Sequence, residues 1–378
     1  MNIIHTPNLF FPYIGGVSNH VLYLSKVLVK KNHRVKVICA KDPNSTLKEA
    51  FGIDIKRLKS WFKITNTNIT LFLPIEILKN DFDIIHTHMP TPWTSDISIL
   101  LAKLLKRKSV ITIHNDMNKS GFLSKLLTEL YLHTIFLISL SLVDKIIIVN
   151  EGWEKAFNNT KDLLKNYKYK IVTLPNGVDC DLFKPLGIPR EEKTILFVSI
   201  LDKYHEFKGL DYLLKAVKIA RVDIPDIKLL VVGGGSLRDK YVELSRELNI
   251  QNNVQFVGEV GHAELTPFYN RAAVLVLPSI NIEGFGLVLV EALACKTPVI
   301  ATDIVGISDS ILEANCGLII KTKDSRAIAS SICNILQNKK ISEEMGNRGR
   351  VLVVNKYSWE NIASKVESIY KELLDERN

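Results

Sequence analysis

The sequence predicts an α/β protein with two domains, each a doubly wound parallel sheet, that face each other across a cleft. The chain of 378 residues is longer than a usual single domain of about 100–200 residues. Eleven short apolar runs alternate with helical patterns, which is typical of parallel sheets covered by helices on both faces. A single twisted open sheet rarely holds eleven strands, so two sheets are expected.

The expected strands are short runs rich in Ile, Val and Leu, as in strands that are buried on both faces. A polar seam, 185–193, which contains two prolines and a glycine, separates the fifth run from the sixth. In chain order the runs are Asn2–His5, Arg34–Cys39, Ile84–His86, Val110–His114 and Lys145–Val149, then Thr194–Ser199, Lys228–Val232, Val254–Val257, Ala273–Leu277, Val299–Thr302 and Gly317–Ile320.

Positive charge is concentrated in the first half of the chain. Residues 1–185 contain 25 Lys and Arg against 15 Asp and Glu, a balance of +10, whereas residues 186–378 contain 24 against 25, a balance of −1. This asymmetry favours an anionic partner on the first half. Two basic stretches, 56–63 and 103–108, mix cations with large apolar residues, which suits anionic lipid headgroups or an ordinary solvated face.

The composition favours a cytoplasmic protein. Hydrophobic residues make up 47% of the chain and charged residues 24%, as in soluble globular proteins. The N-terminus lacks the pattern of a signal peptide, and the five scattered cysteines indicate neither a disulfide framework nor a zinc site. The most apolar stretch, Leu126–Val143, carries Glu129 and His133, so we expect a buried helix there rather than a membrane span.

Two acidic residues eight positions apart, Glu283 and Glu291, form the most informative motif. Glu283 follows an expected buried strand and falls at its carboxyl end, where open α/β sheets bind ligands. Glu291 lies in an apolar helical run, where a carboxylate needs a partner. Eight residues at about 100° each bring both carboxylates to one side of a helix. A bound ligand explains this pattern, and the alternative for Glu291 is a helix cap or a buried arginine.

The chain resembles the retaining glycosyltransferases of the family 4 type, which have the two-domain GT-B fold. Glu283 and Glu291 match the E-x7-E signature of that family. Further motifs follow in the family's order and span nearly the whole chain. They are Pro12–His20, Asn32–Val35, Asp83–His88, Thr112–Asp116, Pro175–Asp179, Phe207–Gly209 and Val231–Gly235. The resemblance implies a first domain of residues 1–180, joined by a C-terminal helix at about 357–378, and a second domain of residues 181–356.

The resemblance also implies that the second domain binds a nucleotide-diphosphate sugar, such as a UDP- or GDP-sugar. Glu283 would hydrogen-bond the hydroxyls of the sugar and Glu291 the ribose diol, while Lys208 would neutralise the departing diphosphate. A surface lysine is the alternative for Lys208. Further expected donor-binding residues, whose glycines let the backbone approach a ligand, are Gly15, Gly16, Gly234, Val260, Gly284, Phe285, Gly286 and Leu287.

The chain departs from the family at the second cation for the diphosphate. Most relatives carry an arginine where Ile200 stands here. The nearby candidates to replace this arginine are Lys203, His205 and Arg238. The sequence leaves the choice between them open.

His114 is expected beside the reacting sugar. The family has a histidine at the end of this strand, and a structural histidine is the alternative. No cofactor or metal is expected, because His86 and His88 share one face of a strand end but two ligands without a third make a poor metal site. No residue stands out as a nucleophile, which fits a front-face reaction in which the departing phosphate takes the acceptor's proton.

These motifs predict a metal-independent retaining glycosyltransferase whose acceptor is held on the first domain. The basic half favours a lipid or a lipid-linked glycan as the acceptor, with peripheral attachment to the inner face of a membrane. The alternatives are a transferase with a soluble acceptor and a catalytically silent protein that binds nucleotide sugars. A phosphorylase and a nucleic-acid-binding protein are disfavoured, because neither a pyridoxal phosphate lysine site nor a nucleic-acid module is visible. The donor base and sugar, the linkage and the oligomeric state stay open.

Overall fold

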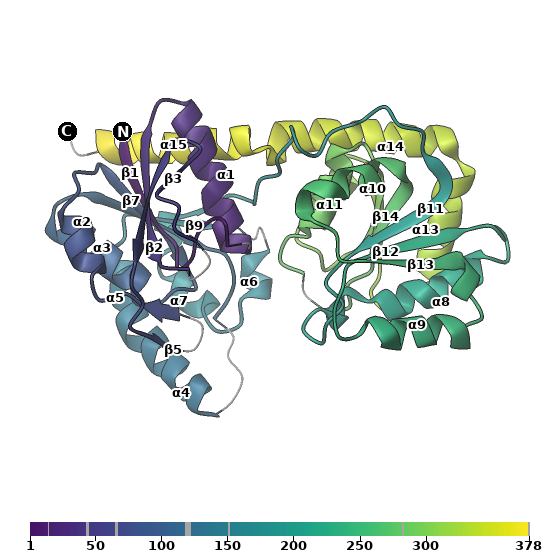
Figure 1. The fold of residues 1–378 in the computed structure, drawn as a ribbon, viewed down its shortest axis with the longest axis horizontal. Helices are drawn as coiled ribbons and strands as arrows, with labels where there is room; N and C mark the ends of the chain where they lie inside the picture. Colours follow the sequence, from purple (N-terminus) through teal and green to yellow (C-terminus); the bar gives the residue numbers. More distant parts are fainter. Residues whose placement is uncertain are drawn as a thin grey trace. The chain divides into compact units, whose positions relative to one another are not determined.

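The computed structural model of the chain has two compact units, each with its own hydrophobic core (Figure 1). It describes residues 1–13, 15–42, 45–64, 67–117, 122–149, 152–281 and 283–376. Unit 1 comprises Met1–Gly177 and Trp359–Asn378, and unit 2 comprises Val178–Ser358. Ile14, which belongs to the motif Pro12–His20, and Ile282, which precedes Glu283, lie outside the described residues.

Unit 1 is built on an eight-stranded sheet. Its strands are β1 (Asn2–Thr6), β2 (Arg34–Ala40), β3 (Glu49–Ala50), β4 (Ile53–Leu58), β7 (Ile84–Met89), β8 (Lys108–Ile113), β9 (Lys145–Ile148) and β10 (Ile171–Thr173). Their spatial order is β10-β9-β8-β7-β1-β2-β4-β3, and all neighbours pair in parallel except β3 and β4. A separate antiparallel hairpin consists of β5 (Phe62–Ile64) and β6 (Thr67–Ile69).

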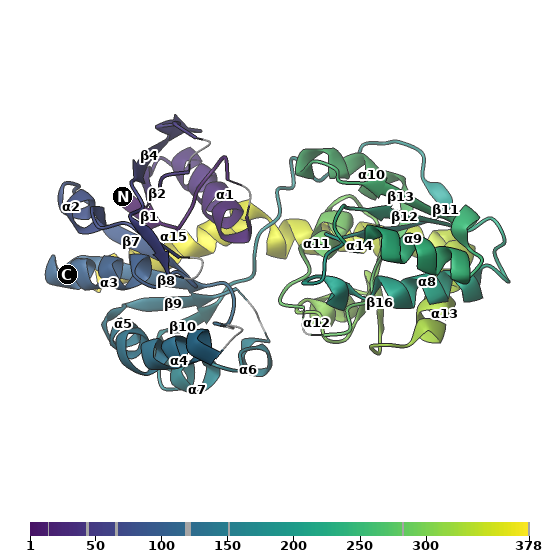
Figure 2. The same cartoon turned by 60° about the horizontal axis from the view of Figure 1, so that its bottom comes forward.

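Helices cover both faces of the unit 1 sheet. They are α1 (Gly16–Lys30), α2 (Leu73–Leu78), α3 (Thr94–Leu104), α4 (Phe122–Tyr131), α5 (Leu137–Leu142), α6 (Trp153–Ala156), α7 (Lys161–Lys165) and α15 (Trp359–Asp375). The C-terminal helix α15 packs beside α1, where Ile362 and Val366 join Leu24 and Leu28 in one core cluster (Figure 1). Figure 2 shows α4, α5 and α7 gathered beside β9 and β10.

Unit 2 is built on a six-stranded parallel sheet. Its strands are β11 (Glu191–Val198), β12 (Lys228–Val232), β13 (Val254–Gly258), β14 (Ala272–Leu277), β15 (Val299–Thr302) and β16 (Gly317–Ile320), in the spatial order β13-β12-β11-β14-β15-β16. Its helices are α8 (Leu210–Ala220), α9 (Arg238–Glu247), α10 (Thr266–Arg271), α11 (Leu287–Ala294), α12 (Ser308–Glu313), α13 (Ser325–Gln337) and α14 (Lys339–Leu352). One core cluster packs α10 and α11 on one face of the sheet, and another packs α8, α9 and α13 on the opposite face (Figure 1).

This topology confirms the predicted α/β class with two doubly wound parallel sheets. It also positions the loops that matter for ligand binding. Because β11 and β14 are parallel neighbours, the loops that follow them leave the sheet at the same edge. In unit 1 the neighbours β1, β7 and β8 bring the segments that carry His5, His86, His88 and His114 together in the same way.

The sequence analysis missed five strands, namely β3, β4, β5, β6 and β10. In β4 the apolar residues alternate with charged ones, so that Ile53 and Ile55 are buried while Asp54 and Lys56 are exposed. β4 lies second from the edge of the sheet, and such alternation is a weaker signal in the sequence than a continuous apolar run.

The prediction of a buried helix at Leu126–Val143 was wrong, because much of the surface of this helix is exposed. The helix Ser124–Leu142 is long and apolar enough to cross a membrane by length and composition alone, and 22% of its most apolar stretch is buried. A narrow stripe faces the core through Leu132, Phe136 and Leu140. The apolar residues that are exposed instead are Leu126, Leu127, Leu130, Ile135 and Ile138.

Candidate donor-sugar site and histidine cluster

Lys208 and Glu283 form an ion pair in unit 2. Lys208 ends a 3-10 turn that follows β11, and Glu283 lies on the loop after β14. The Nζ of Lys208 donates to Oε2 of Glu283. The two side chains are only 15% and 12% exposed, so water screens their attraction less than it screens a surface pair. The structure thus brings together two residues that the sequence motifs placed 75 positions apart.

Two backbone features hold this pair in place. The amide of Ile280 donates to the carbonyl of Phe207 over 2.7 Å, which ties the two loops together. Gly209 has a φ of +75°, and a Cβ there would lie 2.1 Å from the carbonyl oxygen of Pro278. Only glycine combines this left-handed conformation with so close an approach. The position of Lys208 beside Glu283 therefore depends on its glycine neighbour.

Glu283 precedes the helix that carries Glu291 and is not part of it. Its backbone forms a bridge to Val305, and its carbonyl accepts from the amide of Gly306 over 3.0 Å. Gly286 caps the helix with a φ of +83°, and α11 starts at the next residue. The prediction that helical rotation brings the two carboxylates to one side of a helix was wrong, because the four residues from Glu283 to Gly286 precede α11.

Glu291 is a buried carboxylate with two partners inside unit 2. It is 5% exposed and accepts from the hydroxyl of Tyr269 over 2.6 Å. The Nε2 of His262 lies 3.0 Å from its other oxygen. This hydrogen bond to Glu291 raises the pKa of His262, and burial raises the pKa of Tyr269. The partners are therefore neither a helix end nor an arginine, and the sequence analysis had not identified them.

The segment between the two carboxylates exposes backbone rather than aromatic surface. The ring of Phe285 is buried 5.5 Å from the ring of Tyr357, so only its main chain can face a ligand. A Cβ on Gly286 would approach Val305 to 2.9 Å. Leu287 is the first residue of α11 and is 40% exposed, so the start of this helix is accessible, and amides at a helix start favour an anion or a hydroxyl.

The glycine loop after β12 packs against the segment after β11. A Cβ on Gly233 would lie 1.8 Å from the carbonyl of Ser199, and the carbonyl of Gly234 accepts from the amide of Leu201 over 2.8 Å. A Cβ on Gly234 itself would lie 3.4 Å from Cβ of Glu259, one residue before Val260. The structure thus gives these glycines a packing role, whatever they bind.

Three residues remain candidates for the second cation at the diphosphate. Lys203 is exposed, His205 holds Asp202 through Nδ1 at 2.7 Å, and Arg238 starts α9 and pairs with Asp239. Ile200, at the position of the missing arginine, is 56% exposed. The carbonyl of His205 accepts from the amide of Lys208 over 3.0 Å. Among the described residues, no side chain of the three candidates bonds to the side chain of Lys208 or Glu283.

Five buried histidines cluster in unit 1. Nδ1 of His5 lies 3.2 Å from Nε2 of His88, and Nδ1 of His88 lies 3.2 Å from Nε2 of His114. His86 contacts the hydroxyls of Tyr370 and Thr112, and His20 contacts Asn176. Burial lowers the pKa of His5 to about 3 and of His20 to about 4, and it lowers the pKa of the other three well below the ordinary value. All five imidazoles are therefore neutral near pH 7.

His114 is thus part of a network that the sequence analysis saw only in part. The nearby Asp116 does not offer a free base, because its carboxylate accepts from the amides of Asn158 and Asn159 and from the hydroxyl of Thr160. Gly15 caps α1 in an extended conformation with a φ of −173°. A Cβ on Gly16 would meet nothing within 4 Å, so the first turn of α1 faces open space.

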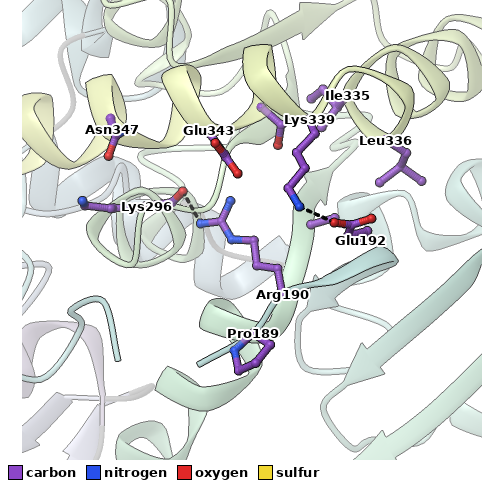
Figure 3. A pocket seen from close by; sticks show the side chains of 11 residues that line it. Pro189, Arg190, Glu192, Lys296, Ile335, Leu336, Lys339, Glu343 and Asn347 are labelled. Carbon is purple, nitrogen blue, oxygen red and sulfur yellow. Dashed lines mark hydrogen bonds and ion pairs between the residues drawn. The ribbon is translucent and has the colours of Figure 1, made fainter. Parts of the chain in front are cut away.

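A cavity of about 460 Å³ lies elsewhere in unit 2 (Figure 3). Its walls include Arg190 and Glu192 at the start of β11 and Ala273 at the start of β14, so it lies at the opposite edge of the sheet from Lys208. In Figure 3 Arg190 donates to the carbonyl of Lys296, and Lys339 donates to Glu192. Because the cavity lies at the edge of the sheet away from Lys208 and Glu283, it is separate from the candidate donor site.

Comparisons with known proteins cover nearly the whole chain. The model "Glycosyltransferase Family 4" matches residues 14–182, and "Glycosyl transferases group 1" matches residues 180–352. A phosphatidyl-myo-inositol mannosyltransferase of Mycobacterium leprae is 26% identical over 96% of this chain and 94% of its own length. A D-inositol 3-phosphate glycosyltransferase of Corynebacterium aurimucosum is 30% identical over 78% of this chain and 72% of its own length. The structure of Anabaena HepE in complex with UDP has a TM-score of 0.79 at 16% identity and covers 98% of this chain and 100% of its own.

Replacing His262 by glutamine should cost stability mainly in mildly acidic solution. Glu291 raises the folded pKa of His262 above 6.5, so their ion pair stabilises the fold fully below that pH and progressively less as pH rises through the folded pKa. The difference in melting temperature between the parent and His262→Gln should therefore shrink between about pH 6 and pH 9. The variant His133→Gln, at an exposed histidine paired with Glu129, is the control. A difference that does not change with pH would contradict a charged His262.

Proposed function

The chain belongs to glycosyltransferase family 4 and has the GT-B fold, and we propose that it transfers a sugar, with retention of configuration, from a nucleotide-diphosphate sugar to an acceptor hydroxyl. The observation that carries this proposal is the ion pair of Lys208 and Glu283 at the carboxyl edge of the unit 2 sheet, followed on the next helix by the buried carboxylate of Glu291. Such an edge is where open α/β sheets bind nucleotides.

Each of these groups suits one part of a nucleotide sugar. A carboxylate offers about four acceptor positions, so Glu291 can hold Tyr269 and His262 and still accept from a ribose diol. Lys208 supplies a fixed cation for the diphosphate. When the diphosphate takes Lys208 as its partner, Glu283 becomes available to the hydroxyls of the sugar. The structure of HepE with UDP supports a nucleoside diphosphate as the ligand and leaves the base and sugar of this chain's donor open.

The proposed reaction needs stabilisation of the departing phosphate more than a nucleophile. Lys208 and the first-turn amides of α11 stabilise the negative charge that develops on the phosphate as the bond between sugar and phosphate breaks. The phosphate then accepts the proton of the attacking hydroxyl on the same face of the sugar. For His114 we propose a hydrogen bond to the sugar, made by a neutral imidazole because burial lowers its pKa.

We further propose an acceptor that carries a lipid or a lipid-linked glycan. Unit 1 has a cavity of about 740 Å³ whose lining combines the cations Lys41, Lys59 and Lys63 with the rings of Trp61 and Phe62. Cations beside exposed aromatic and aliphatic surface suit an anionic headgroup. The exposed apolar residues of α4 and α5 are a second apolar surface on the same unit. By its name, the M. leprae relative acts on phosphatidyl-myo-inositol, which is a lipid of this kind.

The second candidate is a transferase with a soluble phosphorylated acceptor. The same three lysines could bind a free phosphate, and the C. aurimucosum relative is named for D-inositol 3-phosphate. A catalytically silent protein is the third candidate, and turnover with any acceptor would exclude it. Vesicle binding separates the first two candidates.

Glu291→Gln should weaken binding of the nucleotide, whereas Glu283→Gln should mainly lower kcat. The first change removes the charge that grips the ribose, and the second removes the group that positions the sugar. Each loss could reach about 2–4 kcal/mol in a water-poor site. Calorimetric titration and initial rates measure the two effects, with Glu313→Gln, an exposed carboxylate on α12, as the control. Unchanged affinity and turnover in both variants would reject these roles.

Turnover should persist in EDTA, because Lys208 and backbone amides supply the positive charge at the diphosphate. Initial rates before and after removal of divalent ions with a chelator provide the measurement. Full loss of activity that manganese or magnesium restores would show that a metal carries the phosphate charge instead.

Binding to vesicles should require anionic lipid and should weaken as salt rises. Substitution of Lys59 and Lys63 by glutamine should reduce it by about 1 kcal/mol per residue. Arg57 lies in the same basic stretch but is unsuitable for this test. Its guanidinium donates to backbone carbonyls, so its substitution would also destabilise the fold. The matched control changes the exposed Lys215 and Lys218 of unit 2. Sedimentation at several salt concentrations measures the binding.

An apolar variant completes the vesicle test. Leu126→Ser with Leu130→Ser removes exposed apolar surface from α4 without changing charge, so it should weaken vesicle binding and leave the salt dependence as it was. Equal binding of the parent to neutral and anionic vesicles, or to neither, would put the soluble acceptor first.

A further inference from the structure

Three histidines from separate elements of unit 1 converge on one point. His20 lies on α1, His88 on β7, and His114 directly after β8. One ring nitrogen of each lies within 4.8 Å of a ring nitrogen of the other two. The ring centroids are 4.7 Å apart for His20 and His114, 5.5 Å for His88 and His114, and 5.8 Å for His20 and His88.

These separations fit coordination of a single metal ion. Nitrogens that bind zinc at about 2.0–2.1 Å and at tetrahedral angles lie about 3.3 Å from one another. Nδ1 of His88 and Nε2 of His114 lie 3.2 Å apart. The same distance suits a hydrogen bond, so the two imidazoles can pair directly or hold an ion between them with a small displacement.

The outer nitrogens of two of these histidines have the partners that metal ligands usually have. Nδ1 of His20 lies 2.8 Å from Oδ1 of Asn176, to which it donates, so Nε2 keeps its lone pair. Nε2 of His88 lies 3.2 Å from Nδ1 of His5. A histidine that binds a metal almost always donates its other ring N–H in this way, which fixes its tautomer and orientation.

Hydrogen bonding alone does not satisfy the whole cluster. Nε2 of His5 is buried and has no partner within the described part of the chain. An ion on His20, His88 and His114 would not bond to this atom, so His5 enters the inference only as the outer partner of His88. If an ion binds Nδ1 of His88, then Nε2 of His88 carries the proton and donates to His5, and His5 carries its own proton on Nε2.

The second group of neighbouring histidines, His5, His86 and His88, fits an ion less well. Both ring nitrogens of His86 already contact hydroxyls, of Tyr370 at 2.5 Å and of Thr112 at 2.6 Å. The ring of His86 is also stacked on that of His88, with centroids 4.6 Å apart and an angle of 23° between the rings, so its in-plane lone pairs do not point toward His88. All three are fully buried, whereas His20 and His114 are 4% and 7% exposed.

We propose that His20, His88 and His114 form a binding site for one divalent transition-metal ion of the zinc type. Neutral imidazole nitrogens suit zinc, copper, nickel and iron, and three of them leave a fourth position for water. The sequence analysis discounted a metal because it saw only the pair His86 and His88. The fold supplies the missing ligands from α1 and from the end of β8.

A bound ion would inhibit turnover rather than assist it. This part of the inference rests on the proposed function, because it assumes that His114 contacts the sugar. An ion on Nε2 of His114 occupies the lone pair that faces the cluster and fixes the ring, so zinc should inhibit turnover and EDTA should restore it. Binding of the ion itself does not depend on that assumption.

The test is a titration of the chelator-treated, full-length protein with Co²⁺, whose visible absorption reports nitrogen coordination. The measurement uses neither donor nor acceptor, so it remains valid if the proposed function is wrong. We expect saturation at one ion per chain and loss of the absorption when Zn²⁺ is added in equal amount. His20→Asn and His114→Asn should abolish this binding, and His86→Asn should retain it.

A milder variant guards against unfolding of buried histidine variants. Asn176→Ala removes the partner of His20 without touching a ligand and should weaken Co²⁺ binding about 10–100-fold, while thermal melting shows that the protein stays folded. Absence of visible absorption in the parent would overturn the proposal. So would binding that His86→Asn abolishes and that both His20→Asn and Asn176→Ala leave intact, because the ion would then lie in the other group.

Discussion

The ion pair between Lys208 and Glu283 is the interaction on which the candidate donor site depends. It joins the loops after β11 and β14, and the left-handed Gly209 allows those loops to approach closely enough for it to form. The pair has little exposure to water and holds both side chains at the carboxyl edge of the sheet before a ligand arrives. A diphosphate must then compete with Glu283 for the lysine, which couples binding of the phosphate to release of the carboxylate that we assign to the sugar.

Most of the fold could be predicted from the sequence, because strands buried on both faces have a strong local signature. The predicted runs 273–277 and 299–302 consist almost entirely of apolar residues and correspond to β14 and β15. The short strand β10 and the alternating β4 lie toward the edges of the unit 1 sheet, where that signature is weak. The exposure of α4 could not be foreseen, since apolar composition alone does not tell which face of a helix finds a partner.

The sequence predicted candidate site residues only where they lie in short local motifs. Glu283, Glu291 and Lys208 lie in motifs, and the sequence identified them. Tyr269 and His262 hold Glu291 from 22 and 29 positions away, with no local pattern to mark them. The histidine cluster likewise has no local sequence pattern that marks it. Its members come from α1 and from three parallel strands and their ends, and only the topology shows that they meet.

The most direct test of the donor site is a thermal-shift panel of UDP, GDP, ADP and their sugars, with the corresponding nucleosides as comparators. A ligand that binds only the folded protein stabilises it by about 2.7 kcal/mol at a concentration of 100 times Kd, so the melting temperature should rise with concentration. The account predicts a shift for at least one nucleoside diphosphate and a much smaller one for its nucleoside, because Lys208 recognises phosphate. No shift with any nucleotide, or equal shifts with nucleotide and nucleoside, would contradict it.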